Sequence, residues 1–500
     1  MIRRPSVSQV LVSLKPLNSR ARGAVSHKYN EGYTSKKHGE RCFCFSSPSQ
    51  YSSLKVISLP SIGSSRSHAD VYVSGSDISA KHLSFYINYR TGITVVEDKS
   101  GGNTRVYQDK NSSTDRMSPG KYATAALTKG LNGVLSIGSR NDPANFEIIW
   151  EVGTDTMMEV VRKRIAALPK PPPDEDIYIY TDQVYWKQPP KPIKHFPVAE
   201  LGRGGFGKVM KTIDSYTGGV MAVKKLFRPM DDRSNDWIDT LVTARDREVF
   251  LLSKLKHGHI VEYLGSQGWD TGVVEIFMPM KRGTLAQFVR KYPSYSDVQK
   301  TGNVVLLQML SALDYLDYHR LIHRDVKPEN ILYDVKRVNG EEHEVFQLAD
   351  FGLSVLQDLG RSFAGTKPFM APEVYDGARQ QTPKVDIWSL YATMLWVYNE
   401  GLFRHRVESG RLDRHSYASA AILNIASTSK DLRYLRSMAI YDPSLRASAA
   451  QMLTGLKRQD LMTSKAPGPM HSYSEWMQSV KAGKSTYSSY LTQIMEQPFY

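Results

Sequence analysis

Short apolar runs separated by Gly, Ser and Asn turns fill the region between residues 40 and 152. This pattern is typical of strands. We expect strands at Tyr51–Leu59, Asp70–Val73, Leu83–Tyr89, Ile93–Glu97 and Phe146–Trp150. Because short strands at close spacing favour two packed sheets, the region predicts an all-β sandwich.

Helical spacing of apolar residues appears in the second half of the chain, where it predicts a core-facing helix through Leu306, Met309, Leu313 and Leu316. Two shorter apolar runs, Met221–Val223 and Phe346–Ala349, predict strands. Each run leads directly into a charged residue, Lys224 or Asp350. One strand is therefore expected to carry the ammonium of Lys224, and the carboxylate of Asp350 is expected at the end of the other.

Proline-rich runs separate these regions. A basic helix is expected over Asp155–Leu168, and Pro169–Asp176 and Pro189–Pro192 interrupt the chain after it. Because proline runs continue neither helix nor strand, we interpret residues 153–194 as a helix and a semi-rigid linker between separately moving bodies. Residues 458–500 are expected to be a C-terminal tail, either with a short docking helix at Glu475–Val480 or without fixed structure.

The composition limits the classes of function that are compatible with this chain. A chain of 500 residues with 41% hydrophobic content has room for two or more domains. Its net charge of +15 comes from Lys and Arg spread along the chain, which favours acidic or phosphorylated partners over direct nucleic-acid binding. The only cysteines, Cys42 and Cys44, favour a reducing compartment, the nucleus or the cytoplasm. No apolar stretch is long enough to span a bilayer, so no membrane partner is expected.

The start of the chain is basic and rich in serine, and its first acidic residue is Glu31. Transit peptides and disordered basic tails share this balance. We interpret residues 1–39 as a disordered tail.

His323–Asn330 is the most informative stretch for chemistry, because it sets a carboxylate (Asp325), an ammonium (Lys327) and an amide (Asn330) on one short loop. Phosphoryl transfer needs an aligned acceptor hydroxyl, a held nucleotide and negative charge spread over metal and cations. Upstream, Gly202–Val209 fits the spacing G-x-G-x-x-G-x-V, which lets backbone N–H groups approach phosphates.

Three further segments complete the pattern. Lys224 needs a carboxylate partner, and Glu248, which precedes apolar residues at helical spacing, fits this role. Asp350–Gly352 offers a carboxylate suited to Mg²⁺, and Ala371–Glu373 follows it. In this order, residues 195–457 resemble a eukaryotic-type protein kinase. The resemblance implies an α+β bilobal kinase fold.

The kinase resemblance implies ATP and Mg²⁺ as cofactors. Asp325 would accept the proton of the substrate hydroxyl, and Lys327 would neutralise charge on the transferring group. Lys224, paired with Glu248, would anchor phosphates. The implied metal ligands are Asn330 and Asp350. The implied nucleotide contacts are Gly202, Gly204, Gly207, Val209, Ala222, Lys224, Met278 and Met280.

Other segments resemble structural parts of the family. Asp386–Ser389 resembles the segment that braces the catalytic loop, and Asp442–Arg446 resembles the site whose arginine pairs with Glu373. Lys327, together with Gly365-Thr366 before the Ala-Pro-Glu segment, resembles the serine/threonine branch.

Arg324 stands beside the expected base, and in this family an arginine here can pair with a phosphate on the activation loop. We expect Ser362 to be the phosphate acceptor, with Thr366 in the same loop. An unmodified Ser362 is the alternative.

Two segments of the strand-rich region, Ile78–Phe85 and Val96–Val106, resemble the forkhead-associated family, whose sandwiches bind phosphothreonine. The family's Gly-Arg pair is replaced by Ser64-Ser65, which leaves Arg66 as the nearest guanidinium. His82 is expected to brace the loops. The implied phosphate contacts are Arg66, Ser79 and Lys81.

We therefore expect a serine/threonine protein kinase that the sandwich directs to phosphothreonine-containing proteins. The domain order resembles checkpoint kinases of the DNA-damage response. Two alternatives stay open: a catalytically silent kinase-like scaffold, and an active kinase whose sandwich is autoinhibitory or forms a homodimer. The scaffold is disfavoured by the joint presence of Lys224, Asp325, Asn330 and Asp350.

Overall fold

The computed structural model divides the chain into two compact units, Met1–Arg203 with Lys208–Val223, and Gly204–Gly207 with Lys224–Tyr500. The residues that the structure describes are 10–46, 57–88, 91–117, 123–129, 132–166, 193–204, 207–227, 249, 253–269, 273–292, 294–338, 341–356, 365–375, 381–485 and 488. The boundary between the units runs through strands and not through the proline-rich segment.

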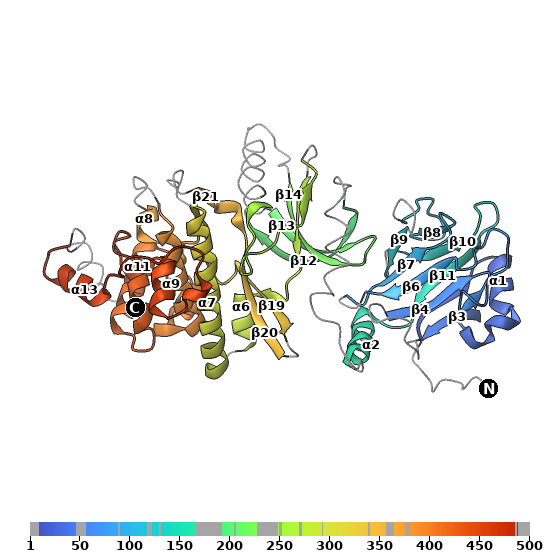
Figure 1. The fold of residues 1–500 in the computed structure, drawn as a ribbon, viewed down its shortest axis with the longest axis horizontal. Coiled ribbons are helices and arrows are strands. Elements are labelled where there is room, and N and C mark those ends of the chain that lie inside the picture. The colour runs from blue at the N-terminus through green and yellow to red at the C-terminus, as the bar shows by residue number, and fades with distance from the viewer. Residues whose placement is uncertain are drawn as a thin grey trace. The chain divides into compact units, whose positions relative to one another are not determined.

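The strand-rich part of the first unit contains two sheets (Figure 1). The six-stranded sheet has the order β2 (Thr34–Lys37), β3 (Glu40–Ser46), β1 (Val10–Pro16), β11 (Ala144–Trp150), β10 (Val134–Ile137) and β8 (Thr104–Tyr107). The five-stranded sheet has the order β5 (Val71–Tyr72), β4 (Ile57–Gly63), β6 (Leu83–Ile87), β7 (Thr94–Asp98) and β9 (Thr124–Leu127). The prediction of a β-rich domain is confirmed.

A shared apolar core joins the two sheets. The rings of Phe45 in β3 and Phe85 in β6 lie 5.6 Å apart between centroids, and both side chains are buried. Side chains alternate between the two faces of a strand, so β6 buries Leu83, Phe85 and Ile87 and leaves the residues between them partly exposed. The helix predicted over Asp155–Leu168 is present as α2 (Thr154–Ala166).

The interpretation of residues 1–39 as a disordered tail is wrong for residues 10–37. Strand β1 pairs with both β3 and β11 at the centre of its sheet, and Leu11 and Leu14 are fully buried. Helix α1 (Ser19–Ser26) and the 3₁₀ helix η1 (Lys28–Tyr33) follow it. The basic residues of this segment are exposed or form polar contacts, and they flank an apolar strand. The charge balance by itself gives no sign of that strand.

A five-stranded sheet with the order β12 (His195–Gly204), β13 (Gly207–Asp214), β14 (Val220–Phe227), β16 (Val273–Pro279) and β15 (Gly265–Gln267) precedes the helical part. Short pairings follow in β17 (Gly283–Thr284) with β19 (Ile331–Val338) and β20 (Glu341–Leu348), and in β18 (Leu321–Ile322) with β21 (Val355–Leu356). In the second unit, the described α-helices are α6 (Leu285–Lys291), α7 (Tyr295–Tyr318), α8 (Pro372–Tyr375), α9 (Lys384–Tyr398), α10 (Phe403–Glu408), α11 (His415–Thr428), α12 (Ala449–Gly455) and α13 (Tyr473–Lys481).

Helices α7 and α9 form the centre of the helical core (Figure 1). The four apolar residues predicted to face a core from α7 are all buried: Leu306, Met309, Leu313 and Leu316. Nearly every residue of α9 is buried, from Val385 to Val397. A helix that is apolar on all sides lies inside a domain, so α9 is a rigid support for the loops around it.

The predicted tail helix is present as α13, and it packs on the helical core through Tyr473, Trp476, Met477 and Val480. The chain before it is tied down by Asp314 in α7, whose carboxylate accepts the N–H groups of Thr463 and Ser464 at 2.6 and 2.9 Å. This part of the tail is therefore an ordered component of the second unit.

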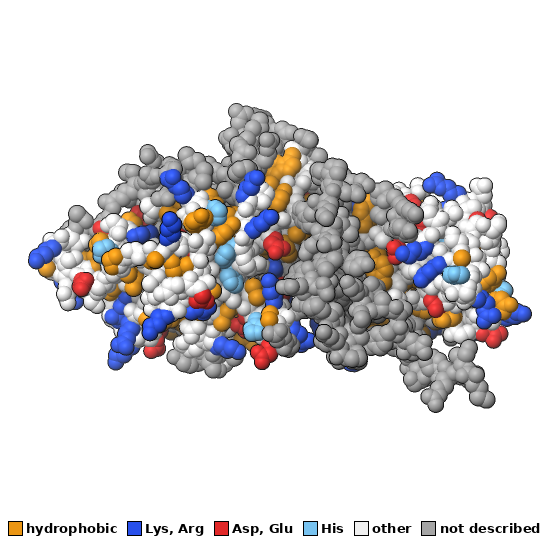
Figure 2. Space-filling view, in the orientation of Figure 1, with side chains coloured by type: hydrophobic (Ala, Val, Ile, Leu, Met, Phe, Trp, Pro, Cys, Tyr) orange, Lys and Arg blue, Asp and Glu red, His pale blue; other side chains and the backbone are white. Residues whose placement is uncertain are grey.

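Charges of both signs are mixed on the described part of the face that Figure 2 shows. Figure 2 shows Lys and Arg side chains dispersed among acidic and uncharged side chains on the described part of the visible face. Within the described residues, none of the helices combines the length and apolar character that crossing a membrane requires.

A buried ion pair stabilises the helical core. Arg446 donates to both carboxylate oxygens of Glu373 at 2.6 and 2.9 Å, as its motif predicted, and neither side chain is more than 4% exposed. The same guanidinium also donates to the carbonyl oxygens of Lys384, Ile440 and Tyr441. This one side chain therefore ties α8 and α9 to the segment before α12.

We predict that Arg446→Met lowers the free energy of unfolding by about 3–5 kcal/mol, because it leaves the Glu373 charge buried without its partner. Urea denaturation followed by circular dichroism measures the change. Arg337→Met is the matched control, since Arg337 pairs with Glu342 at 3.5 Å on the surface, and it should cost less than about 1 kcal/mol. Equal losses in both variants would contradict the prediction.

Candidate active site

The loop His323–Asn330 has no helix or strand of its own, and a carboxylate holds it. Asp386 in α9 accepts the N–H groups of His323 at 2.7 Å and Arg324 at 2.8 Å. Burial raises the pKa of Asp386 to about 7, and the two N–H donors oppose this rise. Arg324 has a φ of +69°, a left-handed conformation that is costly for a residue with a Cβ. Asp386 helps to hold the backbone in this conformation.

His323 is fully buried and serves as a neutral brace. Its Nδ1 accepts the N–H of Asp325 at 3.3 Å, so its Nε2 carries the proton and donates to the carbonyl oxygen of Ala349 at 3.1 Å. Burial lowers the pKa of His323 to about 4, in agreement with this uncharged form. The imidazole thereby connects the loop to the end of β20.

Asp325 lies at the centre of the site. Lys327 Nζ and Asn330 Nδ2 donate to its Oδ2 at 2.7 and 2.8 Å, and Thr366 Oγ1 donates to its Oδ1 at 2.7 Å. Lys327 Nζ also donates to Thr366 Oγ1 at 2.6 Å. The structure therefore brings the predicted base, cation and amide together. The contact with Thr366 joins residues 41 positions apart, and local sequence did not indicate it.

Lys224 and Asp350 meet, although 126 positions separate them. Lys224 Nζ donates to Asp350 Oδ1 at 2.9 Å, and the Asp350 side chain remains 44% exposed. Burial would raise the pKa of Asp350, but the charge and hydrogen bond of Lys224 outweigh it, so this pKa is lowered. The N–H of Ala349 donates to the carbonyl oxygen of Asn330 at 2.9 Å. The two implied metal ligands, Asn330 and Asp350, therefore lie on adjacent segments.

In the described part of the glycine-rich segment, Gly207 occupies a position that only glycine can take. Gly207 has a φ of +134°, and a Cβ on it would lie 2.0 Å from the carbonyl oxygen of Lys225 in β14. The remaining predicted nucleotide contacts lie on four strands or beside them: Gly202 and Gly204 in β12, Val209 in β13, Ala222 in β14, Met278 in β16 and Met280 just after β16. Glu248 and Ser362 lie outside the described residues.

The residues present fit ATP and Mg²⁺. The oxygen atoms of Asn330 and Asp350 are ligands that Mg²⁺ accepts, and this ion usually adds water and phosphate oxygens to one or two carboxylates. Within the described ranges, no group of three or more His, Cys, Asp or Glu could hold a metal by itself. Lys224 and Lys327 offer ammonium groups to phosphates, and the bound nucleotide would supply the transferable phosphoryl group.

Comparison with known proteins agrees with this geometry. The family described as protein kinase domain matches residues 197–455. The chain belongs to the protein kinase family. The predicted class of this domain, a serine/threonine kinase domain of a family that uses ATP and Mg²⁺, is thereby confirmed.

Several kinases are similar to this one. Mitogen-activated protein kinase kinase kinase 1a of Physcomitrium patens is 32% identical over 255 residues, 48% of this chain and 32% of that protein. A serine/threonine-protein kinase of Saccharomyces cerevisiae is 30% identical over 204 residues, 40% of this chain and 13% of that protein. Aurora kinase of Schizosaccharomyces pombe is 32% identical over 193 residues, 38% of this chain and 50% of that protein. The kinase thus spans at most half the length of these relatives.

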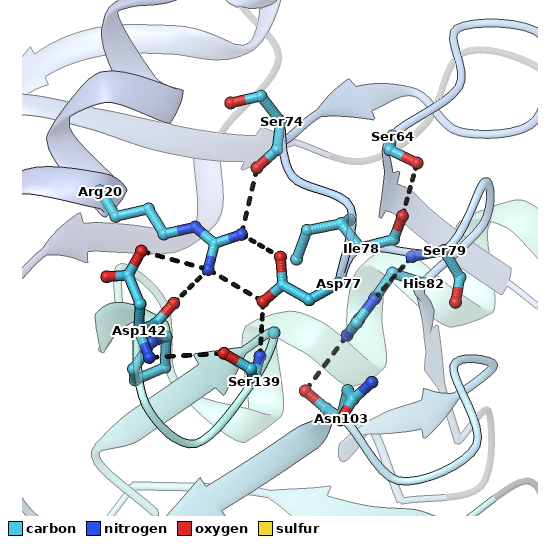
Figure 3. A network of polar contacts seen from close by, with 12 residues as sticks. Arg20, Ser64, Ser74, Asp77, Ile78, Ser79, His82, Asn103, Ser139 and Asp142 are labelled. Atoms are coloured by element: carbon cyan, nitrogen blue, oxygen red, sulfur yellow. Dashed lines mark hydrogen bonds and ion pairs between the residues drawn. The ribbon is translucent and has the colours of Figure 1, made fainter.

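A second group of polar residues gathers at one end of the sandwich (Figure 3). Ser64 Oγ donates to the carbonyl oxygen of Ile78 at 2.6 Å, and the N–H of Ser79 donates to Nδ1 of the buried His82 at 3.1 Å. His82 Nε2 then lies 3.2 Å from the carbonyl oxygen of Asn103. The His82 side chain thus joins its own loop to the loop of Asn103, so it braces neighbouring loops, as predicted.

The predicted phosphate contacts of the sandwich lie on adjoining loops. The N–H groups of Ser64 and Ser65 donate to the carbonyl oxygens of Ser79 and Ala80 at 3.0 and 3.2 Å, which joins the loop of Arg66 to that of Ser79 and Lys81. The Arg66 guanidinium lies 4.2 Å from the centre of the Tyr29 ring. Lys81 is exposed.

Arg20 is the residue of this loop group that the sequence did not indicate. It forms an ion pair with Asp77, with Nη1 2.9 Å from Oδ2, and donates to the carbonyl oxygen of Ser74 at 3.2 Å (Figure 3). The hydrogen bond from Arg20 lowers the pKa of Asp77 against its burial. Arg20 thus fixes the loop two residues before Ser79. The nearly continuous apolar run Val10–Leu14, followed by the N-cap Asn18, was the available signal for this ordered element.

We predict that Thr366→Val lowers kcat by about tenfold, because the hydroxyl bonded to Asp325 and Lys327 is lost from a buried carboxylate. Thr366→Ser keeps the hydroxyl and should retain most of the activity. Steady-state phosphorylation of a generic protein substrate measures both. Equal activities of the Val and Ser variants would show that the hydroxyl does not hold the base.

Proposed function

We propose that this kinase transfers the γ-phosphoryl group of ATP to serine or threonine hydroxyls of other proteins. The main support for this proposal is the carboxylate of Asp325, which Lys327, Asn330 and Thr366 hold in one orientation. A carboxylate in this environment can accept the proton of a hydroxyl that attacks phosphorus. The ammonium of Lys327, 2.7 Å from this carboxylate, would neutralise negative charge that develops during the transfer.

The remaining residues position the reactants. Lys224 and Asp350 attract each other at 2.9 Å, and both would bind phosphate or metal charge when nucleotide is present. A silent scaffold is disfavoured, because the four residues on which transfer depends are present and mutually arranged: Lys224, Asp325, Asn330 and Asp350.

Replacement of the base tests the proposed activity. Asp325→Asn should reduce phosphoryl transfer from labelled ATP by at least about 100-fold, since an amide cannot accept the proton. Arg337→Met, on the exposed hairpin of β19 and β20, is the matched control and should keep full activity. Equal incorporation by Asp325→Asn and the unchanged protein would exclude Asp325 as the base, and no incorporation by either would support the scaffold.

We also propose that the sandwich binds phosphothreonine and thereby directs the kinase to phosphorylated proteins. Support comes from the adjoining loops that carry Ser79, Lys81 and Arg66, braced by the buried His82. A hydroxyl, an ammonium and a guanidinium can hold a phosphate dianion through charge-assisted hydrogen bonds. The family's Gly-Arg pair is replaced here by Ser64-Ser65, and the nearest guanidinium, that of Arg66, lies 4.2 Å from the centre of the Tyr29 ring.

Peptide titration tests this second proposal. A phosphothreonine peptide should bind the full chain at least about tenfold more tightly than its unphosphorylated form, and Ser79→Ala should remove most of that difference. Ser113→Ala, in an exposed loop, is the control. Calorimetry that gives equal affinities for both peptides would remove the phosphothreonine function and leave the kinase proposal intact.

A place in DNA-damage checkpoint signalling, in the nucleus or the cytoplasm, is a further proposal that rests on the order of sandwich, linker and kinase. Phosphorylation of Ser362 likewise stays a prediction, to be checked by mass spectrometry of the purified protein. The relatives described above have names that refer to other kinase classes.

A further inference from the structure

The five-stranded sheet of the sandwich has an apolar patch on its outer face. Val96 packs into the sandwich core, so its neighbour Val95 points to the opposite side of the sheet. Ala126 pairs with Val95 and lies outside the sandwich core with it. An outer face is normally solvated, yet the exposed fractions are 4% for Ile93, 0% for Val95 and 0% for Ala126.

The hairpin of β13 and β14 covers this patch. Ile93 and Ala126 form one apolar cluster with Ile213 of the hairpin, against which Phe196 and Val220 also pack. At its tip Gly218 has a φ of +67°, and a Cβ there would lie 2.9 Å from Ile93 Cγ2. The tip therefore approaches the sheet as closely as the absence of a side chain allows.

Hydrogen bonds fix the same contact. Strand β9 is at the edge of its sheet, and its Ala126 N–H donates to the carbonyl oxygen of Ser215 at 2.8 Å. From the turn between β6 and β7, Thr91 Oγ1 donates to Gly218 at 2.9 Å and Asn88 Nδ2 donates to Thr217 at 3.2 Å, in both cases to the carbonyl oxygen. An edge strand that would otherwise expose its backbone is thus occupied.

The hairpin tip is shaped for this role. Asp214 Oδ1 accepts the N–H groups of Tyr216 and Thr217 at 2.8 and 2.6 Å, and the side chain is only 2% exposed. These bonds set the turn so that the carbonyl oxygens of residues 215, 217 and 218 are available to the sheet.

We propose that the outer patch of the sandwich, formed by Ile93, Val95 and Ala126, is a docking surface whose partner is the β13–β14 hairpin of the same chain. All of these residues belong to one compact unit. The docked hairpin continues along β14 into Lys224, so the sandwich restrains the strand that carries the phosphate-binding ammonium.

The docking surface and the polar loops occupy opposite ends of β6 and β7. Ser79 and His82 precede or adjoin the start of β6, whereas Asn88 and Thr91 follow its end. Docking therefore leaves the loops at the other end of the sheet available, and it does not depend on whether those loops bind phosphothreonine.

Cleavage of the chain between the sandwich and the kinase tests the proposal. A protease site is placed within residues 174–186 of the full-length protein, which is then cut and measured by size-exclusion chromatography with light scattering. The two fragments should elute together with the mass of one chain. Separation of the fragments of the unchanged protein would overturn the proposal, and a mass of two chains would assign the patch to a second copy instead.

Two variants locate the contact. Gly218→Ala should separate the cut fragments, whereas Gly483→Ala should not, because Gly483 has a similar φ of +70° with open space around it. Ile93→Ala, which removes apolar contact without backbone strain, should weaken co-elution as well. Hydrogen exchange of peptides covering β9 should be about tenfold faster in Gly218→Ala. Unchanged co-elution and exchange in both Gly218→Ala and Ile93→Ala would show that this patch does not hold the fragments together.

Discussion

The buried carboxylate of Asp386 is the constraint on which the catalytic arrangement depends. A loop without helix or strand lacks the regular backbone pairing of those elements, and leaving its N–H groups buried and unpaired is costly. Asp386 accepts two of them, from His323 and Arg324, and α9 around it is buried on all sides. The loop can therefore hold a left-handed residue immediately before Asp325.

The charged groups of the site form close ion pairs. Phosphate groups or a metal ion would replace one member of a pair when nucleotide binds. Lys327 is held by Asp325 and Lys224 by Asp350, each within 2.9 Å. The buried His323 stays neutral, so it adds orientation without adding charge. Asp350 remains partly exposed, which keeps one member of a pair within reach of an incoming cation. Arg446 and Glu373 also form a close ion pair, but this pair is buried and serves to hold the fold together.

In the sandwich, a side chain that is buried on the outer face of a strand indicates that another part of the chain packs there. Alternation assigns Val96 to the sandwich core and Val95 to solvent, yet both are fully buried. The hairpin contact explains this result. It also explains why the compact units do not divide at the proline-rich segment, where composition places the boundary.

The sequence by itself determined the chemistry of the kinase site, because its residue types occur in short motifs with strict local spacing. It also determined strands such as β6 and helices such as α7, where the apolar period is regular over one element. Only the tertiary structure decided that β1 belongs to the sandwich, that Arg20 holds Asp77, that Thr366 bonds to Asp325 and that the hairpin covers Ile93. These contacts join residues far apart in the chain, and local periodicity and composition hold no information about which distant surfaces meet.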